Sequence, residues 1–303
     1  MGLGWALVVA PYVAWNYDIS GEVLPSTADA KVAQNAPRRE LPLGERALEM
    51  LLPLSAGAQL MGLPGVIFGV ALIVQRARHD RRTWLFLLPL AWAVAHWLLF
   101  TLRLPAPFQH GRYVMPMLPP VLLYLSGGLL GLVEAGRRSV AGRVLSRTLA
   151  LGTFLLFPGF WWIGGQAYAQ DVRLINTEMV ATARWVERNV PPDDLFAVHD
   201  IGALGYFANR EILDLAGLVS PEVVPLFPNP PAIMQLVCES GAGWMMVLPD
   251  QRETSGASAT DPRLELAYES PYDDMAQARG RTTEPWKMRV YRVRCGPDSL
   301  DQD

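Results

Sequence analysis

Long apolar runs dominate the first part of the chain, and they end near Gln170. A helix that crosses a bilayer needs roughly 20 mostly apolar residues. Four segments meet or approach this requirement, namely Leu51–Val74, Trp84–Leu102, Val114–Val133 and Leu149–Gly165. We therefore predict a polytopic α-helical membrane domain over residues 1–169.

A fifth apolar segment, Gly2–Trp15, is shorter than the other four. It lacks the basic start and the small-residue cleavage site that a signal peptide needs. We interpret it as the outer part of a transmembrane helix whose beginning is missing, so that the membrane domain has about five spans. On this interpretation the chain is the C-terminal part of a longer protein.

Arginine is concentrated in two connectors between the predicted spans. These residues are Arg76, Arg78, Arg81 and Arg82 in one connector, and Arg137, Arg138, Arg143 and Arg147 in the other. Cytoplasmic loops of membrane proteins carry an excess of Lys and Arg. If the spans alternate, both connectors lie on the cytoplasmic side. Residues 16–50, residues 103–113 and everything after residue 166 are then expected to face outward.

The pattern changes to alternating short strands and helices over residues 170–303, which predicts a small extracytoplasmic α/β domain with a mixed sheet. Helical spacing places Ile175, Met179, Ala183 and Val186 on one face of a helix over Val172–Asn189. Further helical segments are expected at Ile201–Ala208 and Pro231–Glu239, and strands at Leu195–His199, Glu211–Leu215, Trp244–Leu248, Leu264–Glu269 and Met288–Arg294. We expect Met288–Arg294 to be an edge strand and Gln251–Pro262 to be a polar, mobile loop.

Composition agrees with this division. The chain is 51% hydrophobic and only 18% charged, whereas a soluble domain usually carries about 25% charged residues. A net charge of -3 without a basic stripe gives no indication of a nucleic-acid partner. The two cysteines, Cys238 and Cys295, could form a disulfide outside the cytoplasm or remain as two buried thiols.

One candidate site lies where a predicted strand passes into a helix, at His199-Asp200 and the residues up to Tyr206. Ligands commonly bind at the carboxyl ends of strands in α/β sheets. Asp200 could instead simply cap the following turn, and Gly202 and Gly205 allow close backbone approach. The segment is not a dinucleotide-binding fingerprint, and no nucleophile completes a hydrolase triad with His199 and Asp200.

A second candidate is Gln109-His110-Gly111-Arg112-Tyr113, in a predicted outer loop just before a span. An arginine at the membrane surface can hold a phosphate through charge-assisted hydrogen bonds. Anchoring to lipid headgroups explains the same residues equally well. His96, inside a predicted span, is expected to be hydrogen-bonded to a neighbouring helix rather than to serve as a ligand.

The first outer loop contains Leu24-Pro25-Ser26-Thr27 followed by Lys31, which offers a turn, two hydroxyl groups and a cation. Solvated loop residues are the default interpretation. Asp18 and Asp29 could act as bases, but nothing in the sequence places either beside a reacting group.

Three segments together resemble the GT-C superfamily of polyprenyl-phosphate-sugar-dependent membrane glycosyltransferases, including PMT-like and arabinofuranosyltransferase-like members. Gly21–Lys31 resembles an outer loop with the pattern G-x-x-L-P-N-T-x-x-A-K, and Gln109–Pro120 resembles H-x-R-Y-x-x-P-x-x-P. His199–Tyr206 with Asp214–Leu218 resembles the pattern D-I-G-x-L-G-Y followed by D-x-x-G-L in their extracytoplasmic domain. The three matches occur in the family's order and span nearly the whole chain.

The resemblance implies transfer of a sugar from a polyprenyl-phosphate donor, with inversion at the anomeric carbon, to a glycan, lipid or protein acceptor on the outer face of a bacterial plasma membrane. It assigns donor phosphate or sugar binding to Lys31, His110, Arg112 and Tyr113. The motif residues Asp200, Gly202, Gly205, Tyr206 and Asp214 would shape the outer domain or line its membrane-facing side. No cofactor is evident; some members use a divalent metal, but no ligand cluster is present here.

This sequence departs from the family pattern at two points. Ser26 stands where asparagine is common. The family's catalytic carboxylate lies in an outer loop near the start of the full-length enzyme, ahead of the part that this chain resembles, so we expect it to be absent here and assign no catalytic base. The rival interpretation is a non-catalytic, membrane-anchored module that binds a glycan or a protein. A transporter is a more distant alternative, because no predicted span carries a charged residue deep in its middle.

Overall fold

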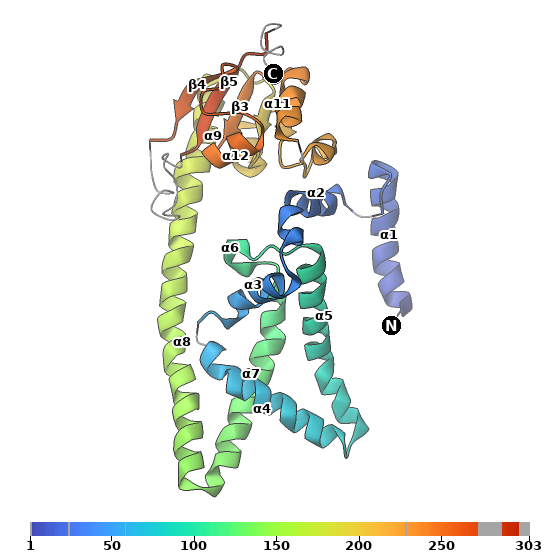
Figure 1. The fold of residues 1–303 in the computed structure, drawn as a ribbon, viewed down its shortest axis with the longest axis vertical. Coiled ribbons are helices and arrows are strands. Elements are labelled where there is room, and N and C mark those ends of the chain that lie inside the picture. Colours follow the sequence, from blue (N-terminus) through green and yellow to red (C-terminus); the bar gives the residue numbers. More distant parts are fainter. Residues whose placement is uncertain (1, 24, 58, 228, 272–286, 297–303) are drawn as a thin grey trace. The chain divides into compact units, whose positions relative to one another are not determined.

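The computed structural model describes residues 2–23, 25–57, 59–227, 229–271 and 287–296 (Figure 1); Leu24 of the first-loop motif lies outside them. The chain divides into two compact units. We call Asn35–Ala167 the helical unit, and Met1–Gln34 together with Tyr168–Asp303 the sheet unit. Each is described separately below.

The helical unit is built from helices joined by short turns. Its helices are α3 (Leu43–Ser55), α4 (Gln59–Ala77), α5 (Leu88–Arg103), the short α6 (Phe108–Gly111) and α7 (Leu118–Ala135). Single turns of 3₁₀-helix precede or follow them at η1 (Pro37–Glu40), η2 (Arg81–Leu87), η3 (Met115–Met117) and η4 (Gly136–Arg138). Helix α8 (Val140–Leu174) begins in this unit and ends in the sheet unit.

Four helices among the described residues are long and apolar enough to cross a membrane, which confirms four of the predicted spans by length and composition. They cover Gln59–Ala77, Arg81–Arg103, Met115–Arg138 and Val140–Asn189. Helix α1 (Gly2–Ser20) has 19 residues but is not one of these four. The fifth span therefore stays a prediction.

The expected span Leu51–Val74 is wrong at its beginning. Leu51–Ser55 belongs to α3, and the chain turns before α4 starts at Gln59. Gly57 makes this turn with a φ of 91°, a left-handed conformation that glycine adopts at little cost. The apolar run in the sequence thus crosses a helix boundary that hydropathy alone cannot detect.

Small residues let α4 and α7 pack closely. Gly62, Gly65 and Gly69 of α4 face Leu125, Leu129 and Gly128 of α7, and a Cβ added to Gly128 would lie 1.6 Å from the Gly65 carbonyl oxygen. Figure 1 shows both helices running toward the same end of the unit. The two arginine-rich connectors follow these helices and so lie at that common end, as alternating spans require.

One helix of 50 residues runs without interruption from Val140 to Asn189. It comprises α8, a π-helical turn η5 (Ile175–Val180) and α9 (Ala181–Asn189). The expected separate helix starting at Val172 is therefore wrong. Between Gly165 and Pro191 the sequence contains neither glycine nor proline, so no residue there interrupts the backbone hydrogen bonds.

The sheet unit contains a five-stranded mixed sheet in the order β2-β1-β3-β5-β4, which confirms the predicted mixed sheet. Its strands are β1 (Phe196–Val198), β2 (Ile212–Asp214), β3 (Trp244–Val247), β4 (Leu264–Glu269) and β5 (Arg289–Val293). Strands β2, β1 and β3 are parallel, and β5 is antiparallel to both β3 and β4. The expectation that β5 is an edge strand is wrong, since it lies between β3 and β4.

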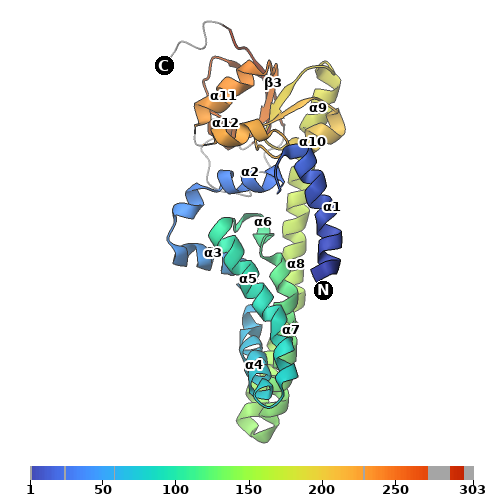
Figure 2. The same ribbon diagram turned by 90° about the vertical axis from the view of Figure 1, so that its right-hand side faces the viewer.

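Helices cover both faces of this sheet (Figure 2). On one face, Phe196, Val198 and Met246 pack with residues of α9 and of the segment α10 (Ile201–Ala203) and η6 (Leu204–Ala208). On the other face, Ala197 and Met245 pack with η7 (Pro221–Leu226) and α11 (Pro230–Glu239). Alternate residues of β1 and β3 therefore serve two separate cores, as the period of two along a strand requires.

The segment expected to be a mobile polar loop, Gln251–Pro262, is partly helical and partly buried. Helix α12 spans Pro249–Thr254, and the side chain of Arg252 is buried against Tyr291, to whose hydroxyl its Nη1 donates at 3.1 Å. Polar residues in this segment bond to other residues of the protein. Composition alone does not distinguish such residues from polar residues that face water. Cys238 and Cys295 form a disulfide with a Cα–Cα distance of 5.5 Å.

The expected outer loop of residues 16–50 is also largely helical. Helix α2 (Ser26–Gln34) occupies its centre and belongs to the sheet unit, whereas η1 and the start of α3 belong to the helical unit. Ser26 and Thr27 thus form the first turn of a helix rather than an open turn.

Candidate functional site

The strand order reverses at β1, which lies between β2 and β3. The connection from β1 to β2 runs through α10 and η6 on one face, and the connection from β2 to β3 returns past β1 through η7 and α11 on the other. In α/β proteins the crevice at the carboxyl ends of the strands beside such a reversal commonly binds ligands.

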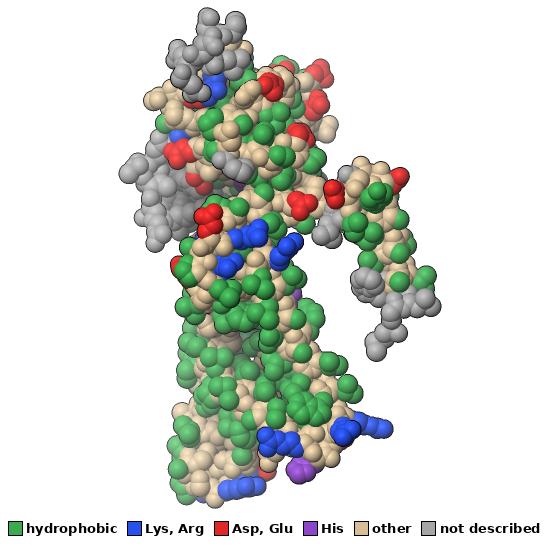
Figure 3. Space-filling model, turned by 45° about the vertical axis from the view of Figure 1, so that its right-hand side comes forward, with side chains coloured by type: hydrophobic (Ala, Val, Ile, Leu, Met, Phe, Trp, Pro, Cys, Tyr) green, Lys and Arg blue, Asp and Glu red, His purple; other side chains and the backbone are tan. Residues whose placement is uncertain are grey.

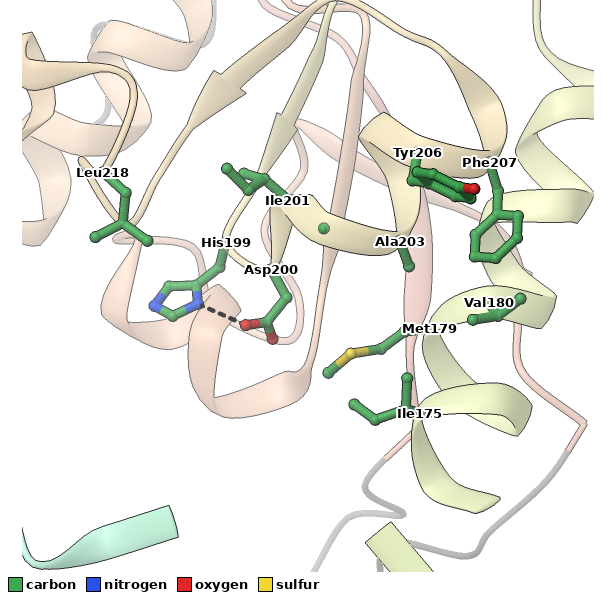
Figure 4. Close-up of a pocket in the computed structure, with 11 residues that line it drawn as sticks. Ile175, Met179, Val180, His199, Asp200, Ile201, Ala203, Tyr206, Phe207 and Leu218 are labelled. Atoms are coloured by element: carbon green, nitrogen blue, oxygen red, sulfur yellow. Dashed lines mark ion pairs between the residues drawn. The ribbon is translucent and has the colours of Figure 1, made fainter. Parts of the chain in front are cut away.

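A pocket of about 600 Å³ lies at this crevice. It is lined by Ile175, Met179 and Val180 of the long helix, by His199 to Ala203 after β1, by Tyr206 and Phe207, and by Leu218 after β2. Figure 4 shows the His199 ring and the Asp200 carboxylate side by side, with Met179 and Ile175 facing the carboxylate from the helix. Its size is typical of a small-ligand site, and its walls are apolar except at the end formed by His199 and Asp200.

Asp200 is the polar centre of this pocket. Its Oδ2 accepts a hydrogen bond of 2.5 Å from Gln251 Nε2, and its Oδ1 lies 3.6 Å from His199 Nδ1. Burial alone would raise the pKa of Asp200, but His199, the bond from Gln251 and the charge of Lys31 together hold this pKa below its ordinary value of 3.8. The carboxylate is therefore ionised at neutral pH and able to accept further hydrogen bonds.

The expectation that Asp200 caps the next turn is wrong. Among the described residues its carboxylate makes no capping bond to the turn that starts at Ile201. The carboxylate instead accepts a hydrogen bond from Gln251, which lies at the start of α12 after β3. Because β3 is parallel to β1, its carboxyl end lies at the same edge of the sheet, and this brings two side chains 51 positions apart into contact.

Asp214 is fully buried and organises the loop that follows β2. Its Oδ1 accepts from the Ala216 amide at 2.9 Å, and its Oδ2 accepts from the amides of Leu218 and Val219 at 2.6 and 3.0 Å. Gly217, with a φ of 69°, completes the turn. The role of Asp214 is thus to shape the domain, and through this loop it positions Leu218 at the pocket.

Helix α2 joins the same loop. Gln34 Nε2 donates to the Ala216 carbonyl at 2.8 Å, and Lys31 Nζ donates to Gln34 Oε1 at 2.9 Å. Helix α2, which carries the end of the first-loop motif, therefore contacts Ala216 of the outer-domain motif through Gln34, 182 positions away. Lys31 lies close enough to Asp200 to contribute to its lowered pKa.

The remaining motif residues after β1 are Gly202, Gly205 and Tyr206, and they differ in how closely the rest of the protein packs against them. A Cβ at Gly202 would extend into open space, and one at Gly205 would make an ordinary contact of 3.4 Å with Ile212. Tyr206 is 82% exposed and packs edge-on against Phe207, over which the Arg184 guanidinium lies at 5.4 Å. Packing within the protein thus does not demand glycine at 202 or 205, and Tyr206 presents its ring to the surroundings.

Arg112 and Tyr113 form a separate cluster in the helical unit. The Arg112 guanidinium lies 4.8 Å from the centre of the Tyr113 ring, and its Nη2 donates to the Tyr113 hydroxyl at 2.9 Å. The Tyr113 carbonyl bonds His96 Nε2 at 2.7 Å, and Phe100 stacks between the two rings. These contacts confirm that His96 is hydrogen-bonded, and they hold an exposed cation in one place.

The backbone before Arg112 is sharply bent. His110 and Gly111 both adopt positive φ angles, of 56° and 68°. A Cβ at Gly111 would lie 2.3 Å from Pro53 Cβ in α3, so only glycine fits. His110 is exposed at the end of α6. The bend turns Arg112 outward from the helical unit while Tyr113 packs inward.

The structure thus places the predicted residues in two groups. Lys31, Asp200, Gly202, Gly205, Tyr206 and Asp214 belong to the sheet unit, and His110, Arg112 and Tyr113 to the helical unit. Gln34, Gln251 and the apolar lining from Ile175 to Val180 were missed. The two glutamines belong to no recognisable sequence motif, and the apolar residues have the same helical spacing as ordinary core positions. Within the described ranges no group of three or more His, Cys, Asp or Glu residues is arranged to hold a metal ion.

Comparison with known proteins yields one family match. Residues 165–291 match a family described as a domain of unknown function, DUF8728. Searches among curated proteins and among solved structures found no match. The matched segment begins near the end of α8 and contains every strand from β1 to β4 together with the pocket residues from Ile175 to Leu218.

Proposed function

We propose that this chain is a GT-C-type membrane glycosyltransferase, or the C-terminal portion of one. It transfers a sugar from a polyprenyl-phosphate donor to a cell-envelope glycan, lipid or protein on the outer face of a bacterial plasma membrane. The observation that carries the proposal is the Arg112 guanidinium held on the Tyr113 ring and hydroxyl.

The chemistry requires a fixed cation. The acceptor hydroxyl oxygen forms a bond to the anomeric carbon of the sugar, the bond from that carbon to the phosphate oxygen breaks, and the acceptor's hydroxyl proton is released to water. Polyprenyl phosphate leaves with the bonding electrons and gains negative charge. A guanidinium that is already oriented stabilises this charge without reorganising during the reaction, and the contacts to Tyr113 provide that orientation.

Two further observations support the proposal. Helix α2, which carries the end of the first-loop motif, contacts Ala216 of the outer-domain motif through Gln34, as parts of one functional unit would. The disulfide between Cys238 and Cys295 suits a sheet unit outside the cytoplasm, because disulfides persist in oxidising compartments.

The decisive experiment uses membranes that contain this chain together with whatever residues its reading frame encodes ahead of it, and measures the protein-dependent release of polyprenyl phosphate from a radiolabelled polyprenyl-phosphate sugar. Arg112→Ala should lower the rate about 100-fold, as loss of one preorganised donor does elsewhere, while Arg112→Lys should retain part of it. Arg103→Ala is the matched control, since Arg103 is also exposed but ends α5. Equal rates for Arg112→Ala and Arg103→Ala would contradict the proposal.

The rival function is a non-catalytic module that binds a glycan or a protein. The apolar pocket beside Asp200 favours it, because a binding site needs no base or leaving-group cation. The same release assay separates the two: donor turnover that depends on the chain excludes the rival, and its absence in membranes that contain the folded chain supports it.

A further inference from the structure

The pocket at the carboxyl end of β1 has apolar walls and a carboxylate, and so differs in chemistry from the cationic cluster at Arg112. Ile175, Met179, Ile201, Phe207 and Leu218 give it apolar walls. Its polar end holds the Asp200 carboxylate, which is ionised at neutral pH, with His199 beside it and Lys31 close enough to lower its pKa. A ligand matched to this pocket has an apolar chain and a head that donates hydrogen bonds, and a phosphate head would be repelled by the carboxylate.

An exposed apolar stripe leads along the long helix to this pocket. Tyr168, Val172 and Ile175 are 71%, 40% and 43% exposed, and Ile175 and Met179 line the pocket. Their spacing of four, three and four residues places them on one side of the helix. The stripe lies on the helix whose composition suits a membrane crossing, so apolar contacts continue from that segment to the pocket.

We propose that this pocket binds the acceptor of the transferase, and that the acceptor is a membrane-borne amphiphile with an uncharged, hydroxylated head. Its chain lies against Ile175, Met179 and Phe207, and a head hydroxyl donates to Asp200. This inference rests on the proposed function, because only a transferase has an acceptor. It assigns the acceptor head to the Asp200 carboxylate and the donor phosphate to the cationic Arg112.

The experiment uses the full chain in phospholipid nanodiscs and a dodecyl glucoside that carries a diazirine at the end of its alkyl chain. After irradiation, labelled peptides should contain residues 175–180 or 201–207. Dodecyl maltoside should compete for labelling, whereas dodecyl phosphate, with the same chain and an anionic head, should compete about tenfold less well.

Two variants make the result specific. Ala203→Trp fills the pocket and should reduce labelling of these peptides about tenfold, whereas Ala267→Trp on the exposed side of β4 should not. Asp200→Asn keeps the walls but removes the charge, so dodecyl phosphate should then compete as well as the maltoside. Labelling that is confined to the membrane helices, or equal competition by the two heads in the natural protein, would overturn the inference.

The labelling needs no turnover, which separates its failure from that of the proposed function. Specific labelling without donor release would retain the pocket as an amphiphile site and contradict the transferase. Donor release without labelling would retain the transferase and contradict this acceptor.

Discussion

The helical unit and the five-stranded sheet differ in where their large apolar side chains lie. In the sheet the large apolar side chains of the strands are mostly inside, with Phe196 and Met245 fully buried. In the helical unit many are outside: Phe154 and Trp161 are 73% and 74% exposed, and glycines lie between α4 and α7. Figure 3 shows hydrophobic side chains covering much of the visible face of the helical unit, with basic side chains at the two ends of this hydrophobic surface.

This difference agrees with the composition of the helical unit, whose long helices are apolar enough to cross a membrane. Water expels apolar surface, so a soluble domain gains stability by filling its interior with large side chains. Lipid is as apolar as leucine and offers no such force between helices. Their association there depends on close backbone approach, for which small residues are best suited.

The largest expected effect comes from Gly128→Leu. Its new side chain would collide with the Gly65 backbone of α4, which cannot move aside as a flexible side chain can, so we expect the helical unit not to assemble. The readout is the fraction of detergent-extracted protein that elutes as a single monodisperse peak. Gly127→Leu is the control, because a side chain there extends into open space; similar losses in both variants would show that the helix contact is unimportant.

Removing large apolar side chains should affect only the sheet unit. Phe196→Ala leaves a cavity in a closed core and should cost about 3–5 kcal/mol. Phe154→Ala, on the exposed face of α8, should change the stability by less than about 0.5 kcal/mol. The midpoints of denaturant-dependent pulse proteolysis measure both. A large loss for Phe154→Ala would mean that another chain covers this face of the helix.

The disulfide should stabilise the sheet unit alone. Replacing Cys238 and Cys295 by serine opens a cross-link between positions 57 apart and should destabilise this unit by about 2–4 kcal/mol. The natural protein under reducing conditions should show the same loss, whereas the extraction profile of the helical unit should not change. An unaltered sheet unit after reduction would contradict this contribution.

The smallest effect concerns pH. The pKa of Asp200 in the folded sheet unit lies below its ordinary value of 3.8. Its ionised form therefore stabilises the fold above about pH 4, and this contribution is lost as the pH falls through the folded pKa. Asp200→Asn should flatten the stability curve below pH 4 while leaving its shape near neutrality unchanged. The side chain is 35% exposed, so solvent screens the effect, and a curve identical to that of the natural protein would contradict it.

The sequence predicts local elements better than contacts between distant ones. Alternation and flanking breakers locate β1, β2, β3 and β4 within a residue or two, because a strand's pattern is contained in the strand. The predicted place of β5 at the edge of the sheet is wrong, although its residue range is close. The order of strands in a sheet depends on pairing between distant segments, which no local pattern in the sequence records. The span expected over Leu149–Gly165 continues as one helix to Asn189, because no glycine or proline follows Gly165 before Pro191.

The site divides in the same way. The motif after β1 indicates a ligand position at a strand end, and the structure has a pocket there. The bond between Asp200 and Gln251 and that between Gln34 and Ala216 join segments that the chain brings together only when folded. Polar pairs of this kind depend on the tertiary fold, so a capping role inferred from neighbouring residues alone was wrong.

The order of the strands has a consequence for biosynthesis. Strand β5 is the last of the sheet to leave the ribosome, yet it fills the gap between β3 and β4. Until it arrives, both neighbours present unpaired edges that can bind other nascent chains. Helix α2 precedes the whole helical unit in the chain but belongs to the sheet unit. The hydrogen bond between its Gln34 and Ala216 can therefore form only after the whole helical unit has been translated. A protein truncated before β5 would lack the strand that joins β3 to β4.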